Sequence, residues 1–448
     1  MKKIIGLLFL LIAIQLNAQC WQKIAVGYSH TMAIKTDGSL WAWGQNQYGA
    51  LGDGTTVNKN IPTQIGTATD WQLIAGGTVF SAGIKTNGTL WTWGWNGWGQ
   101  LGDGTFVEKL IPTQIGTVTD WQSIAIGTGH MMAVKTNGTL WAWGFNGYGQ
   151  LGIGSTMNKT TPTQIGTATN WSSVKTGNLH TIAVKTDGTL WAWGWNAQGQ
   201  LGDGTIIDKL SPLQIGTEAN WQCVDGSTHT SHAIKTNGTL WSWGYNGAGQ
   251  LGDGTTINRH VPTQIGTAVN WQTIAAGDTH TAGIRSNGTL WSWGNNPYGQ
   301  LGDGTTNYTF APIQIGTATN WQSVTSKGNG SVALQSGNLL FAWGHNGAGE
   351  LGDGTSTNRY VPTQIGCALG NETFDDPLFS IYPNPAKDVI HIQTVQSIDT
   401  ILIIDVLGKI VRKEIHTPDI NIQDLQKGIY VLQFFSDGSS HQVKFIKE

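Results

Sequence analysis

Tryptophan recurs along this chain at a fixed interval of fifty residues, and this interval constrains the fold more than any other feature. A constant repeat of this length builds a solenoid, a propeller or another array, because each unit buries its apolar face against the next unit. The 448 residues are also too many for one ordinary compact core. The seven units begin at Trp21, Trp71, Trp121, Trp171, Trp221, Trp271 and Trp321.

Each unit contains the signals of four short strands. An Asn-Gly or Asp-Gly pair, a strong hairpin signal because both residues must adopt positive φ, joins the second and third strands in six units, and Gly337-Asn338 replaces it in the seventh. A proline in the last strand removes a hydrogen-bond donor and so places that strand at an outer edge. Four antiparallel strands per unit, without helical periodicity, predict an all-β fold with a seven-bladed β-propeller in residues 19–370. In the third unit the expected strands are 122–126, 131–136, 139–144 and 161–165.

Most of the tryptophans are expected to form the core between blades. Twenty of the 23 Trp residues occupy three positions of the unit: its first residue and the two of a Leu-Trp-x-Trp-Gly run. Indole rings supply the large buried area that a glycine-rich sheet otherwise lacks. We therefore do not interpret these twenty residues as a sugar-binding ladder.

The complete repeat resembles a known family. Its run reads Gly-x-x-His-x-x-Ala-Ile/Val-Lys-Thr-Asp/Asn-Gly-Thr-Leu-Trp-x-Trp-Gly-x-Asn-x-x-Gly-Gln-Leu-Gly, and it resembles the regulator of chromosome condensation (RCC1) repeat over residues 21–370. The paired glycines and spaced Tyr and Trp of kelch repeats are absent. The resemblance implies a seven-bladed ring. Founding members of that family act as exchange factors on a nuclear GTPase, and we do not expect an exported chain to meet that partner.

The N-terminal residues 1–18 have the pattern of a signal peptide. Lys2 and Lys3 precede an apolar stretch over 4–16, and small residues at 16–18 suit cleavage. The apolar stretch is too short to span a bilayer as a helix, and no other segment is predicted to cross a membrane. A lipid anchor on Cys20 is the alternative, although Gln19 is a poor residue to precede a lipidated cysteine. We expect a secreted or surface protein in an oxidising compartment.

The C-terminal residues 377–448 form a different module after an acidic linker at 371–376. Tryptophan disappears there, and alternating apolar residues predict a small β-sandwich. The expected strands are 389–394, 400–405, 409–415, 429–435 and 442–446.

Four segments of this module, 381–385, 405–409, 427–431 and 443–447, resemble the type A sorting domain of the type IX secretion system. The resemblance implies export across the outer membrane of a bacterium by that machinery, followed by removal of the domain. The product would be released or attached to the cell surface. An ordinary adhesive sandwich module is the alternative.

Two of the three cysteines lie at the ends of the propeller. Cys20 and Cys367 occupy unit positions that lie three residues apart inside the chain, so at the seam between blades seven and one they predict a disulfide. The loop-entropy model gives it about 5–6 kcal/mol of stabilisation. Cys223 falls in a first strand and is expected to be a buried thiol.

The residues most suited to binding lie in loops that differ between blades. The turn before the second strand and the long loop after the third strand are expected on one face, and the Asn-Gly turns on the other. Exposed aromatic residues dominate binding hot spots, whereas rings that only cover the loops beneath them are the alternative. The candidate binding residues are Tyr48, Trp95, Trp98, Phe145, Tyr148, Trp195, Tyr245 and Tyr298.

The remaining polar repeat positions are expected to be structural. His30 and its equivalents are too far apart between blades to share one metal ion, and Asp53 and its equivalents are turn residues before they are calcium ligands. Lys35 and its equivalents are expected to be solvated. We find no catalytic set, metal site or cofactor motif. The net charge of −3, without basic runs, argues against a nucleic-acid partner.

The sequence therefore predicts a monomeric, non-catalytic binding propeller for a protein or a glycan. Inhibition of an extracellular enzyme and glycan adhesion are the alternatives, and hydrolysis is a distant one.

Overall fold

The computed structural model describes residues 21–366, 379–394, 398, 400–405, 410–414, 419–436 and 439–448. The chain divides into two compact units, Met1–Cys367 and Ala368–Glu448. In the described residues no helix is long and apolar enough to cross a membrane. The predicted signal peptide, the linker, and both Cys20 and Cys367 lie outside the described residues, so the disulfide stays a prediction.

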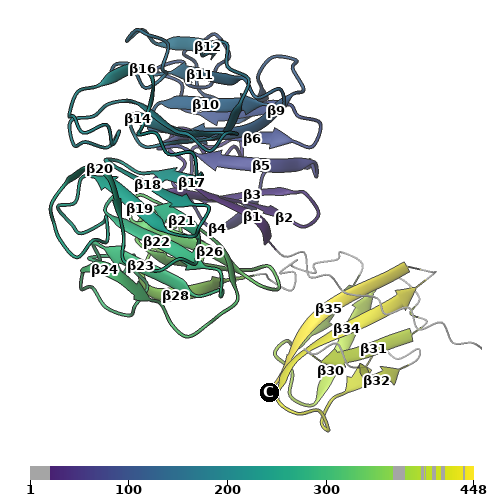
Figure 1. Cartoon of the computed structure of the whole chain (residues 1–448). Coiled ribbons are helices and arrows are strands. Elements are labelled where there is room, and N and C mark those ends of the chain that lie inside the picture. The colour runs from purple at the N-terminus through teal and green to yellow at the C-terminus, as the bar shows by residue number, and fades with distance from the viewer. Residues whose placement is uncertain are drawn as a thin grey trace, which may run out of the picture. The chain divides into compact units, whose positions relative to one another are not determined.

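The first unit is an array of seven four-stranded antiparallel sheets, which we number as blades one to seven in chain order (Figure 1, purple to green). The first strands are β1 (Trp21–Val26), β5 (Trp71–Gly76), β9 (Trp121–Ile126), β13 (Trp171–Thr176), β17 (Trp221–Gly226), β21 (Trp271–Ala276) and β25 (Trp321–Lys327). The second strands are β2 (His30–Lys35), β6 (Phe80–Lys85), β10 (His130–Lys135), β14 (His180–Lys185), β18 (Thr230–Lys235), β22 (His280–Arg285) and β26 (Gly330–Gln335).

The outer half of each blade completes the sheet, as predicted. The third strands are β3 (Leu40–Gly44), β7 (Leu90–Gly94), β11 (Leu140–Gly144), β15 (Leu190–Gly194), β19 (Leu240–Gly244), β23 (Leu290–Gly294) and β27 (Leu339–Gly344). The fourth, proline-containing strands are β4 (Lys59–Gln64), β8 (Lys109–Gln114), β12 (Lys159–Gln164), β16 (Lys209–Gln214), β20 (Arg259–Gln264), β24 (Thr309–Gln314) and β28 (Arg359–Ile365). Each fourth strand pairs only with the third strand, so it is the edge strand.

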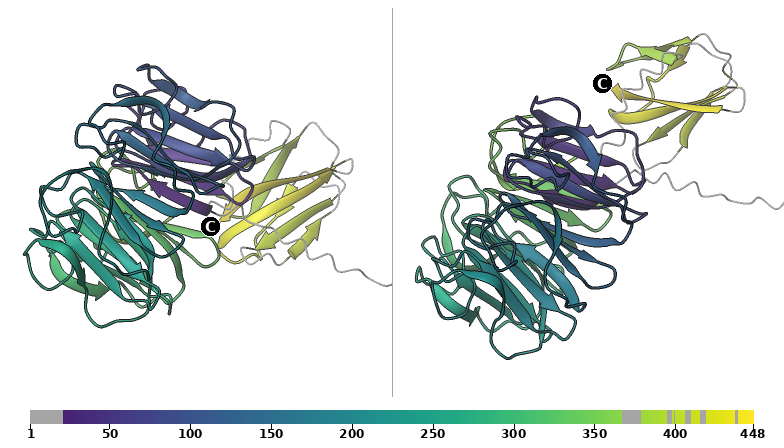
Figure 2. Two further views of the ribbon diagram at one scale, coloured as in Figure 1. Left: turned by 45° about the horizontal axis from the view of Figure 1, so that its top comes forward. Right: turned by 90° about the horizontal axis from the view of Figure 1, so that it is seen from above.

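The blades close into a ring. First strands of consecutive blades contact one another, and β1 contacts β25 and β26, so the purple first blade lies beside the green seventh (Figures 1 and 2). One backbone bond recurs at every joint. Gly54 N donates to Leu110 O at 2.9 Å between blades one and two, and Gly354 N donates to Asn60 O at 2.8 Å across the seam. The seam therefore repeats the backbone bond of the other joints, although the Trp43 indole there has no hydrogen-bond partner among the described residues.

Two of the three tryptophan positions form the core between blades, as predicted. Trp121 and Trp143 of blade three pack against Phe80 and Leu90 of blade two, and both indoles are almost fully buried. The Trp143 Nε1 donates across the joint to Gln100 O at 3.0 Å. Burial of rings of this size contributes several kcal/mol per joint.

The third position is the first tryptophan of the Leu-Trp-x-Trp-Gly run. It is only half-buried, because it lies at the outer side of the sheet under a cation. Lys35 Nζ stands 3.6 Å from the centroid of the Trp41 ring, and Lys235 stands 3.7 Å from that of Trp241. The expectation that these lysines are merely solvated was wrong. Cation–π attraction and packing of the aliphatic stem hold them on the indoles.

The C-terminal unit contains two sheets, ordered β29-β30-β33 and β32-β31-β34-β35, around a shared core that includes Ile390, Ile403 and Phe434. The predicted sandwich is therefore present. Sequence patterns missed β29 and β33, because both are too short to show alternation. The strands are β29 (Phe379–Tyr382), β30 (Val389–Thr394), β31 (Thr400–Asp405), β32 (Ile410–Glu414), β33 (Asp419–Asn421), β34 (Gly428–Ser436) and β35 (Ser439–Lys447).

Candidate binding face

The turn before the second strand and the loop after the third strand of each blade share one face, as expected. In blade one, Gln45 N donates to Ser29 O at 2.7 Å, which joins these two segments. On the opposite face the Asp-Gly turn meets the connection to the next blade, where Trp71 N donates to Gly38 O at 3.2 Å. We call the face that carries the turns and the long loops the variable face.

Aromatic rings on the variable face form one continuous series, in which each ring contacts the next. Ring centroids lie 4.7 Å apart for Trp95 and Trp98, and also 4.7 Å apart for Trp98 and Phe145. Tyr148 continues the series to Trp195 at 6.2 Å. All these rings are partly exposed. This series, named here the aromatic arc, comprises Tyr48, Trp95, Trp98, Phe145, Tyr148, Trp195, His229 and Tyr245.

Seven of the eight predicted binding residues thus lie together, and one does not. Tyr298 contacts His345 at 5.0 Å instead, away from the arc. Sequence reasoning missed His229, which bridges Trp195 and Tyr245. His229 occupies a turn position before the second strand, and this position also varies between blades.

Buried amides position the rings of the arc. The Gln100 side chain is fully buried, and its Oε1 accepts a hydrogen bond from Trp98 N at 2.9 Å. In blade seven the equivalent Glu350 accepts the same bond from Ala348 N, and its other oxygen pairs with His345 at the first ring position. The Gln100 Nε2 is buried and has no hydrogen-bond partner among the described residues.

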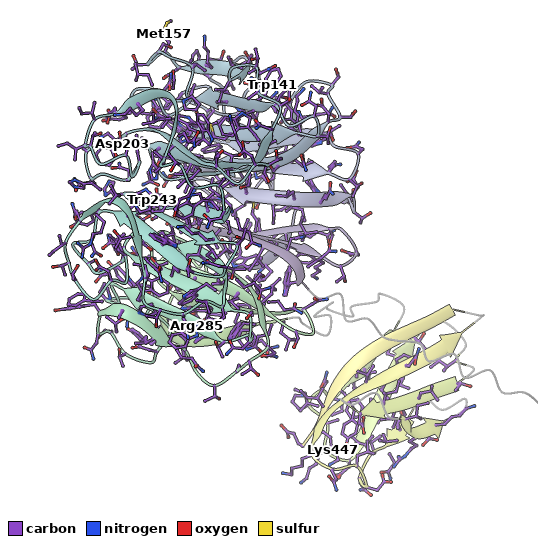
Figure 3. The ribbon with its side chains drawn as sticks, viewed as in Figure 1. Trp141, Met157, Asp203, Trp243, Arg285 and Lys447 are labelled. Atoms are coloured by element: carbon purple, nitrogen blue, oxygen red, sulfur yellow. The ribbon has the colours of Figure 1, made fainter. Side chains whose placement is uncertain are left out.

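Exposed apolar side chains also lie in the long loops that carry the arc, and sequence reasoning missed them. Val107 is 62% exposed, and its carbonyl accepts a bond from Asn96 Nδ2 at 3.1 Å, directly beside Trp95. Met157 is 70% exposed at the outer edge of the propeller (Figure 3). The sequence pattern that indicates these residues is an apolar residue in a loop that is otherwise polar and rich in glycine. The exposed apolar residues of blades two to four at these loop positions are Phe106, Val107, Met157, Ile206 and Ile207.

The repeated histidines join neighbouring blades. His180 is fully buried, and its Nε2 lies 2.9 Å from the Ser231 hydroxyl of the next blade. Burial lowers the pKa of His180 to about 3, so the ring is neutral at physiological pH. The structural role expected for these histidines is confirmed. The described residues contain no group of three or more His, Cys, Asp or Glu side chains placed to hold a metal ion.

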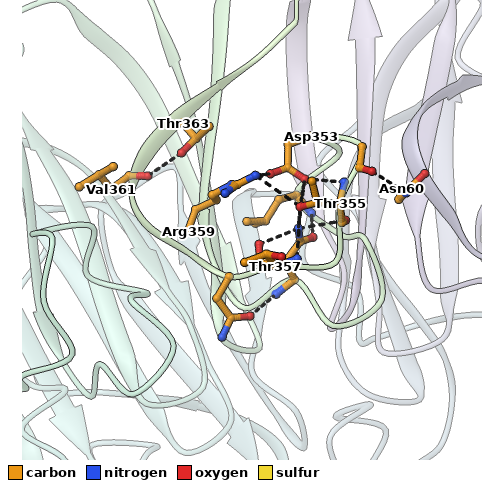
Figure 4. Close-up of polar contacts among 11 residues, drawn as sticks. Asn60, Asp353, Thr355, Thr357, Arg359, Val361 and Thr363 are labelled. Carbon is orange, nitrogen blue, oxygen red and sulfur yellow. Dashed lines mark hydrogen bonds and ion pairs between the residues drawn. The ribbon is translucent and has the colours of Figure 1, made fainter.

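The aspartate of each Leu-Gly-Asp-Gly-Thr loop organises that loop. In blade seven, Asp353 accepts bonds from Asn346 Nδ2, from Thr355 and from Arg359 (Figure 4). Burial opposes ionisation of Asp353, but the bonds from Thr355 and Arg359 outweigh it and lower its pKa. These contacts confirm the predicted turn role.

A cavity of about 540 Å³ runs along the ring axis between the first strands, and Lys327 crosses it. Lys327 Nζ donates to Gly76 O at 2.9 Å and to Ile126 O at 2.7 Å, on blades two and three. Burial lowers the pKa of Lys327 to about 8.

Lys327 occupies a position that is glycine in most blades. A Cβ on Gly177 would lie 2.1 Å from the His180 ring, so the histidine excludes a side chain there. In blade seven Gly330 replaces the histidine and makes room for Lys327.

Comparison with known proteins identifies both units. A model described as the RCC1-like domain matches residues 11–272, more than half of the chain. The chain belongs to the RCC1-like domain family. Models of the RCC1 repeat also match residues 271–300 and 287–334 of this RCC1-like propeller. The secretion system C-terminal sorting domain matches residues 380–448, which supports export by the type IX system to the cell surface or outside.

Solved structures share the fold of the RCC1-like propeller at low identity. Human WBSCR16 is 21% identical with a TM-score of 0.68, covering 73% of this chain and 94% of that one. Prp20p from Saccharomyces cerevisiae, described with its binding to Gsp1p and histones, is 23% identical with a TM-score of 0.62, covering 71% and 84%. Yeast RCC1 (Prp20) bound to Kap60 is 20% identical with a TM-score of 0.66, covering 82% and 88%.

Proposed function

We propose that this exported RCC1-like propeller is a non-catalytic binding protein, and that the part of the aromatic arc on blades two to four contacts its partner. The observation that carries the proposal is the unbroken, partly exposed series of rings from Trp95 to Trp195. A monomeric protein rarely exposes a contiguous apolar patch without using it. Rings already held by neighbours and buried amides lose little conformational entropy on binding.

A protein partner fits this face better than a neutral glycan. Sugar recognition needs polar groups that hydrogen-bond the hydroxyls beside an open ring face. Here the long loops that carry the arc also expose apolar side chains, with Phe106 63% and Ile207 66% exposed. Such side chains gain from contact with apolar protein surface and offer a sugar no hydrogen bond.

Affinity capture with matched variants tests the proposal. The full chain is immobilised and exposed to the growth medium and cell surface extract of the exporting bacterium. We expect a protein that binds the wild type and Tyr298→Ala, and that is lost on Trp98→Ala with Phe145→Ala. The captured protein is then purified and titrated against each variant, and assayed for inhibition if it is an enzyme.

Two results would contradict the proposal. Equal capture by the wild type and the Trp98→Ala, Phe145→Ala double variant would show that the arc is not part of the binding site. Glycan-array binding that depends on Trp98, without any protein captured, would favour the alternative that the propeller binds glycans.

A further inference from the structure

One ion pair recurs beside the variable face of most blades. The aspartate of the Leu-Gly-Asp-Gly-Thr loop pairs with a Lys or Arg six residues further on, at the start of the fourth strand. In blade four Asp203 and Lys209 are 2.8 Å apart. Each such cation is therefore neutralised inside its own blade. The pairs are Asp53–Lys59, Asp103–Lys109, Asp203–Lys209, Asp253–Arg259 and Asp353–Arg359.

Blade three keeps the cation and has lost the anion. Ile153 replaces the aspartate and packs against the apolar core that includes Leu151 and Trp171. Lys159 remains at the start of β12, and no carboxylate of the described residues lies within ion-pair distance of its ammonium group. Lys159 is thus a lysine of this repeat position without its internal partner.

The backbone of Lys159 lies beside the loops that carry the proposed binding face. The Lys159 backbone pairs with Gly144, the residue directly before Phe145. The next residue, Thr160, packs against Gly99, which directly follows Trp98. Lys159 therefore stands at the base of the two loops that carry the closest ring pair between blades.

We propose that Lys159 binds a carboxylate of the partner, and that the partner is a protein surface on which an acidic side chain is surrounded by apolar residues. This inference rests on the proposed function of the aromatic arc. A free ammonium group that an apolar partner covers loses hydration, so its burial is favourable only if the partner supplies an anion. The paired cations of blades two and four do not have this requirement.

The probe is a library of random peptides displayed on phage and selected against the immobilised full chain. We expect peptides that combine Asp or Glu with neighbouring aromatic or aliphatic residues. A synthetic peptide from this selection should bind Lys159→Met roughly tenfold more weakly than wild type, and a Glu-to-Gln version of the peptide should lose a similar factor. Lys209→Met, which removes a paired lysine, is the matched control and should bind as wild type does.

A second variant separates binding from folding. Ile153→Asp restores the carboxylate that five other blades pair with their cation, so the Lys159 ammonium becomes neutralised internally. We expect little change in melting temperature, because the restored ion pair and turn bonds offset the lost apolar packing of Ile153, together with roughly tenfold weaker peptide binding. If Lys159 had only a structural role, peptide affinity would fall only in variants whose melting temperature also falls.

The outcomes distinguish the two proposals. If no selected peptide depends on Trp98, the proposed function fails. If Trp98-dependent peptides lack acidic residues and ignore Lys159→Met and Ile153→Asp, only the carboxylate inference is overturned. Binding of uronic or sulfated glycans that is lost on Lys159→Met, without peptide binders, would overturn the assignment to a protein.

Discussion

The same residue type has two different environments in this propeller, in the joints between blades and on the variable face. Trp143 is fully buried, and its Nε1 bonds a carbonyl of the preceding blade. Trp98, in the loop of that preceding blade, is partly exposed and contacts only other loop rings among its aromatic neighbours. The comparison teaches that position within the repeat, and not residue type, decides whether an indole stabilises the ring or is available to a partner.

The largest expected difference lies in stability. Trp143→Ala removes a buried ring and leaves a cavity at a joint, so the free energy of unfolding should fall by about 3–5 kcal/mol. Trp98→Ala removes a partly exposed ring whose loss leaves no enclosed cavity, and it should cost about 1 kcal/mol. Guanidinium unfolding of both variants measures the difference. Equal costs would break the distinction between joint and face.

The buried histidines should make the joints sensitive to acid. Their folded-state pKa, about 3 for His180, lies below the ordinary 6.5, so the unfolded chain binds protons first as the pH falls. Stability is therefore fully present above pH 6.5 and is lost progressively between 6.5 and 3. His180→Gln should cost about 1–3 kcal/mol at neutral pH, yet its melting temperature should fall less steeply toward acid.

The control variant for this effect retains the His180 ring, which is the group that titrates. Ser231→Ala breaks the contact of His180 with the next blade but retains the histidine, so the wild-type acid slope should persist. Parallel pH profiles for wild type and His180→Gln would contradict the assignment.

Lys327, on the axis of the ring, should instead make stability depend on pH in the alkaline range. The pKa of Lys327 is lowered from 10.5 to about 8, so the cost of the buried charge is present below pH 8 and disappears as the pH rises toward 10.5. Wild type should gain stability relative to Lys327→Met over that range, by at most about 1.4 kcal/mol per pH unit. Thermal melts of both proteins measure the gain, and a constant difference would rule out the buried charge.

The smallest effect is expected at Tyr298, an aromatic residue of the variable face outside the arc. Tyr298→Ala should change unfolding free energy by about 0.5 kcal/mol or less and leave peptide binding unchanged. Isothermal titration with a selected peptide checks this. A loss equal to that of Trp98→Ala would mean that the whole rim, and not blades two to four, is the site.

The repeat period made the fold predictable, whereas the site depended on contacts between blades. Proline and Asn-Gly positions placed the strands of each blade within one or two residues, because turn chemistry is local. Most members of the ring series were predictable, although His229 was missed and Tyr298 lies outside it. Its continuity was not predictable, since Trp98 meets Phe145 only across a joint.

Some features lay beyond the local pattern. The crossing of the axis by Lys327 joins residues that are 201 and 251 positions apart. The exposed loop residues such as Met157 were visible in the sequence, but their outward direction was not. The unpaired Lys159 became apparent only once the five equivalent ion pairs were seen.

The most direct test of the account is the dissociation constant of one partner for wild type, Trp98→Ala and Trp143→Phe, measured with each protein's unfolding curve. Trp98→Ala is expected to weaken binding by tenfold or more (about 1.4 kcal/mol) while the variant remains folded. Trp143→Phe should be less stable but should bind like the wild type. Weaker binding that tracks stability in both variants would contradict the separation of joint and face.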